Sequence, residues 1–180
     1  PQLYFLAIVP PKEIEHEIIR LKEYMRENYD SRAALRSPPH ITLFMPFQFN
    51  EAKEEKLVGS LIDFSKSIDP FQVELKDFNA FPPRVIFIDV VQNNSLNSLQ
   101  QRLNRWMKTE IKIQVKDNPY RTFHPHVTIA FRDLKKSRFL TAWEEFRNKE
   151  ISHEFRSEGF YLLKHDGRVW KKFRFMAFNP

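Results

Sequence analysis

Two short segments of the chain share a pattern of residue types that could carry acid–base chemistry. Residues 39–43 read Pro-His-Ile-Thr-Leu and residues 125–129 read Pro-His-Val-Thr-Ile, so each places a histidine two positions before a threonine. Alternate side chains of a β-strand point to the same face, so in each segment the His and the Thr share one face and the aliphatic residues the other. We therefore expect each segment to bury its aliphatic side and to present an imidazole and a hydroxyl on its other side.

If the two segments lie side by side, two imidazoles and two hydroxyls surround a common point. Imidazole has a pKa near neutrality, so one histidine can accept a proton while the other donates one. The threonine hydroxyls can donate hydrogen bonds to the oxygens of a phosphoryl group from both sides. A phosphodiester fits this arrangement, with water or a ribose hydroxyl as the incoming group. The candidate residues are His40 and His126 for proton transfer and Thr42 and Thr128 for binding the phosphate.

The rest of the chain must position these residues, and its hydrophobic pattern alternates between strands and helices in both halves. Apolar periodicity predicts helices at residues 14–25, 52–65, 96–106 and 137–147, and strands at residues 3–9, 71–75, 85–91, 111–115, 160–164 and 168–175. No linker separates the halves. We expect an α+β fold of two interlocked, pseudo-symmetric lobes, each an antiparallel or mixed β-sheet with outer helices, forming a central cleft. Residues 1–180 would be a single bilobal domain whose lobes exchange strands.

Composition limits the classes of protein to which the chain can belong. Its 180 residues are 42% hydrophobic and carry a formal net charge of +6, with 29 basic and 23 acidic residues. This moderate excess favours an anionic partner, although many soluble proteins have as much. The absence of cysteine excludes disulfides, thiol nucleophiles and cysteine-based zinc sites. The apolar run at residues 3–9 is too short for a signal peptide or a membrane span, so we expect a cytoplasmic monomer that does not bind a membrane.

The paired motifs, the opening strand that runs into Pro10-Pro11 and the repeated arrangement resemble the 2H phosphoesterase superfamily, specifically its 2′-5′ RNA ligase/cyclic phosphodiesterase-like branch. The resemblance spans almost the whole chain. It implies a reaction on 2′,3′-cyclic phosphates or 2′-5′ linkages in RNA or nucleotides, without a metal or another cofactor. His40 and His126 match the family's catalytic histidines, and Thr42 and Thr128 match the hydroxyls that hold the phosphate.

The residues that follow each motif depart from the family pattern. Many relatives have a basic residue and then Phe-Leu-Gly after the first motif, where this chain has residues 44–47, Phe-Met-Pro-Phe. Strand parity predicts that Phe44 shares the face of His40, where it could stack on a base or pack in the core. After the second motif, parity places Arg132 on the face of His126, where it could neutralise phosphate or be solvated.

Basic side chains in two other segments offer a path for an RNA strand. Lys135, Lys136 and Arg138 form one group. In residues 170–175 basic and aromatic side chains alternate, and parity places Trp170, Lys172 and Arg174 on one face. Such a face could stack on bases and bind phosphates, although the same alternation is typical of a half-buried strand.

Four competing interpretations remain open. His124 and His126 form a His-x-His pair that could hold a metal ion, but neither motif contains a third ligand and Asp133 has the opposite parity to His126. The histidines of both motifs could be structural. The protein could also be a binding module that recognises RNA or a nucleotide without chemistry, or an esterase acting on a cyclic phosphate of ADP-ribose or a similar metabolite. Two intact motifs favour an enzyme, because binding alone does not require titrating groups on both sides.

Overall fold

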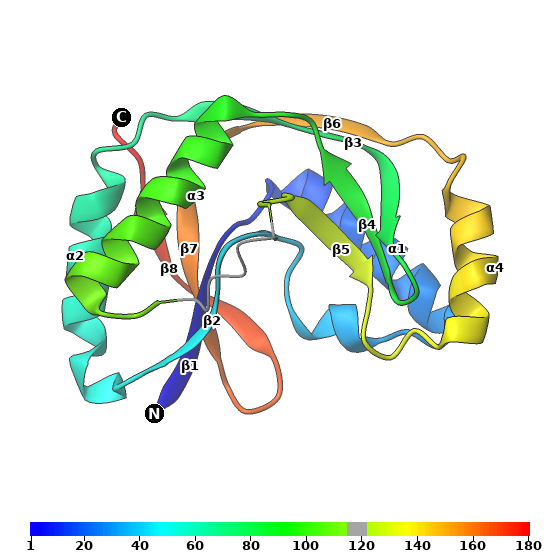
Figure 1. Cartoon of the computed structure of the whole chain (residues 1–180), viewed down its shortest axis with the longest axis horizontal. Helices are drawn as coiled ribbons and strands as arrows, with labels where there is room; N and C mark the ends of the chain where they lie inside the picture. The colour runs from blue at the N-terminus through cyan, green and yellow to red at the C-terminus, as the bar shows by residue number, and fades with distance from the viewer. Residues whose placement is uncertain (115–121) are drawn as a thin grey trace.

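The computed structural model describes residues 1–114 and 122–180, which form two four-stranded β-sheets with helices around them (Figure 1). Sheet A contains, in spatial order, β2 (Ile41–Phe49), β1 (Gln2–Ile8), β7 (Gly159–His165) and β8 (Trp170–Ala177). Sheet B contains β5 (His126–Ala130), β4 (Val85–Val90), β3 (Phe71–Phe81) and β6 (Ser152–Ser157). All strand pairs are antiparallel, and each sheet carries one His-x-Thr motif at an edge strand, β2 or β5.

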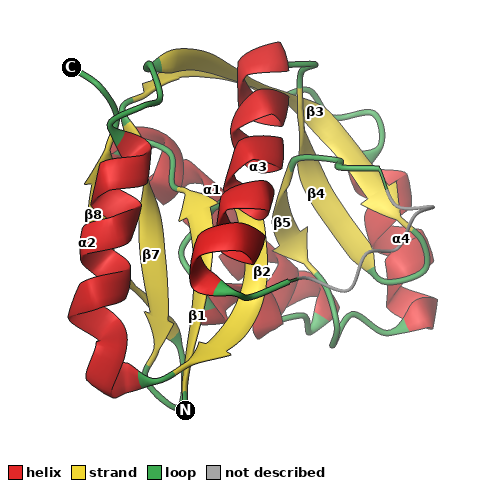
Figure 2. Cartoon of the chain, turned by 60° about the vertical axis from the view of Figure 1, so that its left-hand side comes forward, coloured by secondary structure: helices red, strands yellow, loops and turns green. Residues whose placement is uncertain are grey.

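The helices interlock the two halves. They are α1 (Lys12–Tyr29), α2 (Glu54–Ser65), α3 (Asn94–Trp106) and α4 (Lys136–Phe146), with short helical turns η1 (Ala33–Arg36), η2 (Glu51–Lys53) and the π-helix η3 (Met107–Ile111). Helix α1 follows a strand of sheet A but contacts β5 of sheet B, and α3 follows a strand of sheet B but contacts β2 of sheet A (Figure 2). The expected α+β fold of two interlocked, pseudo-symmetric halves is confirmed. Its description as a single domain stays a prediction.

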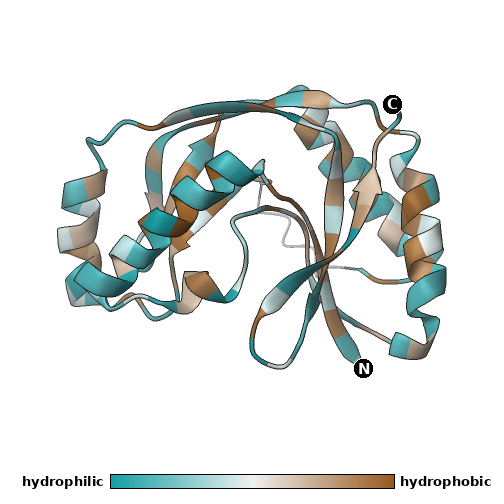
Figure 3. Ribbon diagram, turned by 180° about the vertical axis from the view of Figure 1, so that it is seen from behind, coloured by the Kyte–Doolittle hydropathy of each residue, from teal (hydrophilic) through white to brown (hydrophobic). Residues whose placement is uncertain are grey.

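One continuous apolar core lies between the sheets and their helices. From β1 it includes Tyr4, Leu6 and Ile8, and from β4 it includes Ile86 and Ile88. Each helix carries both hydrophilic and hydrophobic residues, drawn as teal and brown segments in Figure 3. On its opposite face, sheet A carries a separate small cluster built around Phe5, Ala7 and Leu163. Each sheet therefore uses one face for the core and leaves the other for the candidate site.

The expected strand at residues 111–115 is wrong for the residues that the structure describes. Ile111 ends the π-helix η3, residues 112–114 have no regular structure, and Val115 lies outside the described residues. Lys112 adopts a left-handed conformation (φ 64°) and its N–H donates to the carbonyl of Met107, which terminates the helix. Ile111 and Ile113 then both pack against the core, so their alternation reflects a helix end rather than a strand.

Across the two described stretches of the chain, no helix is both long enough and apolar enough to cross a membrane.

Candidate active site

His40 lies directly before β2, and two contacts fix its ring. Its Nδ1 lies 2.7 Å from the carbonyl oxygen of Pro38. A carbonyl only accepts hydrogen bonds, so Nδ1 carries the proton and Nε2 carries the lone pair of the neutral ring. The ring also packs on Phe5 of β1, with 4.9 Å between the ring centroids. Both the tautomer and the orientation of His40 are thus set by its surroundings.

His126, the first residue of β5, is held in the same way. Its Nδ1 lies 2.6 Å from the carbonyl oxygen of His124, again two residues earlier in the chain. Its ring packs on Phe87 of β4, with 4.9 Å between the centroids. Since β4 neighbours β5 as β1 neighbours β2, Phe87 corresponds to the phenylalanine under His40. The two halves therefore build the same histidine site from equivalent strands.

The threonines follow the predicted alternation. In the first motif Ile41 and Leu43 are buried and Thr42 is half-buried. In the second motif the flanking aliphatic residues are likewise buried and Thr128 is half-buried. The sheet register pairs Thr128 with Phe87, and paired residues share a face. Each hydroxyl therefore lies on the histidine-bearing face of its strand.

The two motifs are near one another in the fold. Strands β2 and β5 contact each other although they belong to different sheets. The charge of a protonated His126 also lowers the pKa of His40, so the two imidazoles lie within electrostatic range. The structure thus places the two motifs that the sequence singles out near one another.

A buried lysine supports the segment that leads to His40. Lys22 of α1 is only 2% exposed, and its Nζ donates to the carbonyl oxygens of Ala34 at 2.8 Å and Ser37 at 2.9 Å. Burial lowers the pKa of Lys22 to about 7, and the carboxylate of Glu15 opposes this shift. Helix α1 therefore holds the loop of the first motif through an interior side chain.

The pKa of His40 is lowered to about 4. Burial is the main cause, and the nearby charge of Lys22 acts in the same direction as that of His126, whereas the hydrogen bond to Pro38 opposes them. His40 is consequently neutral at pH 7, with its Nε2 able to accept a proton.

Asp133 ties the two motifs together. It follows the second motif, and its carboxylate accepts hydrogen bonds from Ser31 Oγ at 2.9 Å and from the backbone N–H groups of Arg32 and Ala33 at 3.0 Å each. These groups begin the η1 turn that precedes His40. Asp133, which the sequence offered only as a poorly placed metal ligand, thus joins the chain after His126 to the chain before His40.

The surroundings of His126 include a carboxylate and a second aromatic ring. Asp89 of β4 lies opposite His126 in the sheet register, and its Oδ1 is 3.0 Å from Nε2 of His124. Phe81 is 37% exposed and lies edge-on to both His124 and His126, at 5.2 Å between centroids in each case. The sequence patterns did not single out Asp89, Phe81 or Phe87. The alternation of Phe87 and Asp89 indicates that both side chains lie on one face of β4. That face can be assigned to His126 only when the pairing of β4 with β5 is known.

The His-x-His pair is not arranged around a common ligand. Nε2 of His124 contacts Asp89, whereas Nδ1 of His126 bonds to the backbone. Within residues 1–114 and 122–180, no group of three His, Asp or Glu side chains could hold a metal ion.

Of the two expectations for Phe44, packing in the core is confirmed and stacking on a base beside His40 is wrong. Phe44 is 2% exposed and packs edge-on against Phe47 in the core, at 5.6 Å between centroids. The register of β1 and β2 shifts between Leu6 and Ala7, so Leu43 and Phe44 are both buried in succession. This β-bulge reverses the parity on which the expectation rested.

Of the two expectations for Arg132, the structure supports solvation. Strand β5 ends at Ala130, and Arg132 is exposed in a left-handed conformation (φ 53°). Its guanidinium lies 4.9 Å from the centroid of the Phe131 ring. Strand parity does not extend past Ala130 and cannot place Arg132 beside His126.

The basic face expected in the last strand is also wrong. The register of β7 and β8 shifts between Leu162 and Leu163. Lys172 and Arg174 therefore do not share one face of the strand, and each pairs with a different helix. Lys172 pairs with Glu15 of α1 and Arg174 with Glu55 of α2, each at 3.2 Å. The carboxylates of two helices neutralise these cations.

Comparison with known proteins agrees with this geometry. The model of the 2′-5′ RNA ligase superfamily matches residues 10–169, and the chain belongs to this superfamily. A protein of Oceanobacillus iheyensis is 30% identical over 170 residues, covering 93% of this chain and 92% of the relative. A protein of Geobacillus kaustophilus is 28% identical over 162 residues, covering 89% and 86%. Both carry the name "Putative phosphoesterase".

Solved structures share the whole fold. Escherichia coli LigT complexed with 3′-AMP has a TM-score of 0.70 at 23% identity and covers 100% of this chain and 99% of its own. TT0787 of Thermus thermophilus has a TM-score of 0.68 at 19% identity and covers 99% and 98%. The match to the family model confirms the resemblance to the 2H phosphoesterases inferred from the two motifs, and the solved structures confirm the fold.

Proposed function

We propose that the protein is a metal-independent phosphoesterase that hydrolyses 2′,3′-cyclic phosphate or 2′-5′ phosphodiester linkages in RNA or nucleotides. His40 and His126 are the acid–base pair, and Thr42 and Thr128 bind the phosphate. The observation that carries the proposal is the matched fixation of both rings, each through Nδ1 to the carbonyl two residues earlier. This tautomer directs proton transfer to Nε2 of both histidines. The names of the relatives, and the LigT structures with 3′-AMP, NADP+ and ATP, support a nucleotide phosphoester.

In the proposed hydrolysis of a 2′,3′-cyclic phosphate, water attacks phosphorus opposite one ribose oxygen. His40 accepts the proton of the water, because its lowered pKa keeps it neutral. The phosphorus bond to that ribose oxygen breaks, and the oxygen takes a proton from His126. The product is a phosphomonoester beside a free ribose hydroxyl. The threonine hydroxyls donate to the non-bridging oxygens, where negative charge increases in the transition state.

The test is hydrolysis of a panel of nucleoside 2′,3′-cyclic phosphates and 2′-5′-linked dinucleotides with and without EDTA. We expect at least one substrate to be hydrolysed at the same rate in both conditions, with a bell-shaped dependence of kcat/KM on pH. Loss of activity with EDTA, restored by a divalent metal, would contradict the proposal. Binding of these nucleotides without hydrolysis of any of them would instead support a binding module.

A further inference from the structure

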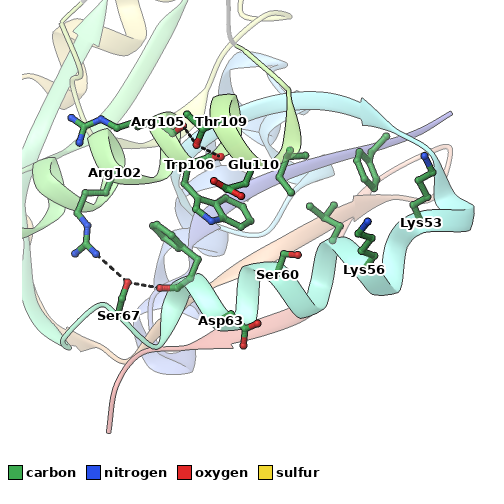
Figure 4. Close-up of a pocket in the computed structure, with 14 residues that line it drawn as sticks. Lys53, Lys56, Ser60, Asp63, Ser67, Arg102, Arg105, Trp106, Thr109 and Glu110 are labelled. Carbon is green, nitrogen blue, oxygen red and sulfur yellow. Dashed lines mark hydrogen bonds between the residues drawn. The ribbon is translucent and has the colours of Figure 1, made fainter.

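A groove separate from the histidines lies between α2 and α3 (Figure 4). Its volume is about 990 Å³, at the upper end of the range of about 300–1,000 Å³ that is typical of ligand sites. The groove lies on the core side of sheet A, where Tyr4 of β1 bonds to Glu54 of α2. His40 packs on the neighbouring Phe5, which belongs to the other face. Sheet A therefore separates the groove from the candidate active site.

Part of the wall of the groove is apolar and includes a half-buried indole. Leu57 and Phe64 of α2 line it, as does Trp106 at the end of α3. Trp106 packs on Phe64 with 5.3 Å between centroids but is itself only half-buried. Figure 4 shows Trp106 between the two helices. Part of the indole is thus open to a ligand in the groove.

Lysine and arginine side chains line the groove on both the α2 side and the α3 side. Lys53 and Lys56 lie at the beginning of α2, and Arg102 and Arg105 lie on α3. All four are exposed. Among the described residues, none of the four forms an ion pair with a carboxylate.

Two carboxylates also line the groove without neutralising these cations. Oδ1 of Asp63 lies 3.9 Å from Nζ of Lys66. Glu110 lies in η3, which follows Trp106 at the end of α3. Arg102 donates to Ser67 Oγ at 3.0 Å, which is a neutral partner. The groove therefore keeps an excess of positive charge.

The last strands of sheet A show the opposite arrangement. Lys164 lies 2.6 Å from Glu54, and Lys172 and Arg174 also pair with glutamates, as described above. Cations that are neutralised by the protein itself offer little attraction to an anion, whereas a cluster without carboxylate partners attracts one. Of these two surfaces, the groove is therefore better suited to an anionic ligand than the basic strand.

We propose that the α2–α3 groove binds single-stranded nucleic acid, with phosphates at its lysines and arginines and a base stacked on Trp106. Each nucleotide of a single strand carries one phosphate and one base with an exposed aromatic face. The base can stack on the indole while the phosphates bind the cations on either side. An acidic peptide would satisfy the cations but would leave the indole without a stacking partner. The choice of RNA over DNA rests on the proposed function. In that case the groove holds a stretch of the RNA away from the reacting phosphate.

The test is fluorescence anisotropy of a labelled single-stranded RNA of about 12 nucleotides that ends in a 3′-hydroxyl. The groove variant is Lys53→Glu with Lys56→Glu, because neither side chain has a structural partner among the described residues. The control is Arg20→Glu with Arg147→Glu, two exposed residues on α1 and at the end of α4 in the other half of the molecule, which changes the net charge equally (Figure 1). Thermal unfolding of all three proteins checks that the fold is kept.

We expect the groove variant to bind the RNA at least about tenfold more weakly, and its plot of log K against log salt to be less steep by about 1.4. The control should stay within about twofold of wild type. Trp106→Phe should abolish most of the quenching of tryptophan fluorescence by RNA. Equal affinity of wild type and groove variant, or equal weakening in the control, would overturn the proposal. Displacement of the RNA by polyglutamate at equal phosphate and carboxylate concentrations would indicate a protein partner instead.

Hydrolysis of a cyclic mononucleotide separates this proposal from the proposed function. A mononucleotide is too short to reach across sheet A, so the groove variant should hydrolyse it at the wild-type rate. If wild type hydrolyses no cyclic nucleotide but RNA binding is lost in the groove variant, the proposed function is contradicted and RNA binding by the groove is supported. If hydrolysis is intact and the groove variant binds RNA as wild type does, only the proposal for the groove is contradicted.

Discussion

The two histidine sites have the same backbone arrangement but opposite electrostatic surroundings. In both, the Nδ1 of the histidine bonds to the carbonyl two residues earlier and the ring packs on a phenylalanine of the adjacent strand. Burial, and after it the charge of the interior Lys22, lowers the pKa of His40. Opposite His126 lies Asp89, a carboxylate. Pseudo-symmetry therefore makes two similar imidazoles, and residues outside the motifs make them different.

This difference is what a two-histidine reaction needs. One imidazole must be neutral and the other protonated at the same pH, and identical surroundings would not favour either assignment. Burial, aided by the charge of Lys22, keeps His40 neutral and suits it as the proton acceptor, and we propose His126, which lies opposite Asp89, as the proton donor. The following predictions test whether the two sites are unequal in this sense.

The largest effect is expected from removing either imidazole. His40→Ala and His126→Ala should each lower kcat for a nucleoside 2′,3′-cyclic phosphate by about 10²–10⁴-fold. The double variant should lose little more than the worse single variant, because the two groups act in one step. Steady-state hydrolysis followed by chromatography of the product measures this. Wild-type kcat in either single variant would contradict the proposal that both histidines transfer protons in the reaction.

The nature of the leaving group should distinguish the two histidines. A nitrophenyl phosphodiester releases a stable anion that needs no proton, so His126→Ala should lose far less activity on it than on a cyclic nucleotide. His40→Ala should remain impaired on both substrates, because the water still has to be deprotonated. The ratio of the two activities in each variant is the readout. Rescue of His40→Ala but not of His126→Ala would reverse the assignment of base and acid.

The threonines should matter about equally in the two halves. Thr42→Val and Thr128→Val keep the side-chain shape but remove the hydroxyl, and each should lower kcat by about 10²-fold, as expected for a donor to a developing negative charge. Serine at either position should restore most of the activity. Unchanged kinetics in either valine variant would show that its hydroxyl does not contact the phosphate.

Lys22→Met should affect both stability and the pH profile. Loss of Nζ leaves the carbonyls of Ala34 and Ser37 without their donor, which should lower the free energy of unfolding by about 1–3 kcal/mol. Removing the positive charge should raise the pKa of His40, so the acidic limb of kcat/KM should move to higher pH. Exposed Lys108→Met is the control. A purely structural role would lower stability and leave the acidic limb in place.

A further effect concerns stability in acid. Because the pKa of His40 is about 4 in the folded protein and 6.5 for an unperturbed histidine, the unfolded chain takes up a proton that the folded one excludes between these values. The free energy of unfolding should therefore fall as the pH is lowered through this window, by at most about 1.4 kcal/mol per pH unit from this group. Urea unfolding of wild type and His40→Gln at several pH values measures it. Equal slopes in both proteins would show that His40 is not responsible.

Local patterns predicted which face of each motif is buried, because a strand has a fixed period of two and no knowledge of the partner strand is needed to apply it. The same rule placed Phe44 on the wrong face, because a β-bulge depends on pairing with β1. Arg132 was misplaced because the end of β5 is not marked in the local sequence.

Other residues near the site could not be predicted from their own segments. Lys22 reaches the first motif because α1 crosses to the other half of the molecule, and Asp89 reaches the second through the register of β4 and β5. Both arrangements are tertiary. The charge difference between the two histidine sites is therefore a property of the fold and not of the motifs.

The central claim is that both histidines act on a single phosphate. A crystal structure with a bound nucleoside 2′-phosphate tests it most directly. The account predicts one phosphate group whose oxygens lie within hydrogen-bond distance of Nε2 of both His40 and His126 and of the hydroxyls of Thr42 and Thr128. A phosphate that contacts only one histidine, or binds elsewhere while the site is empty, would contradict the account.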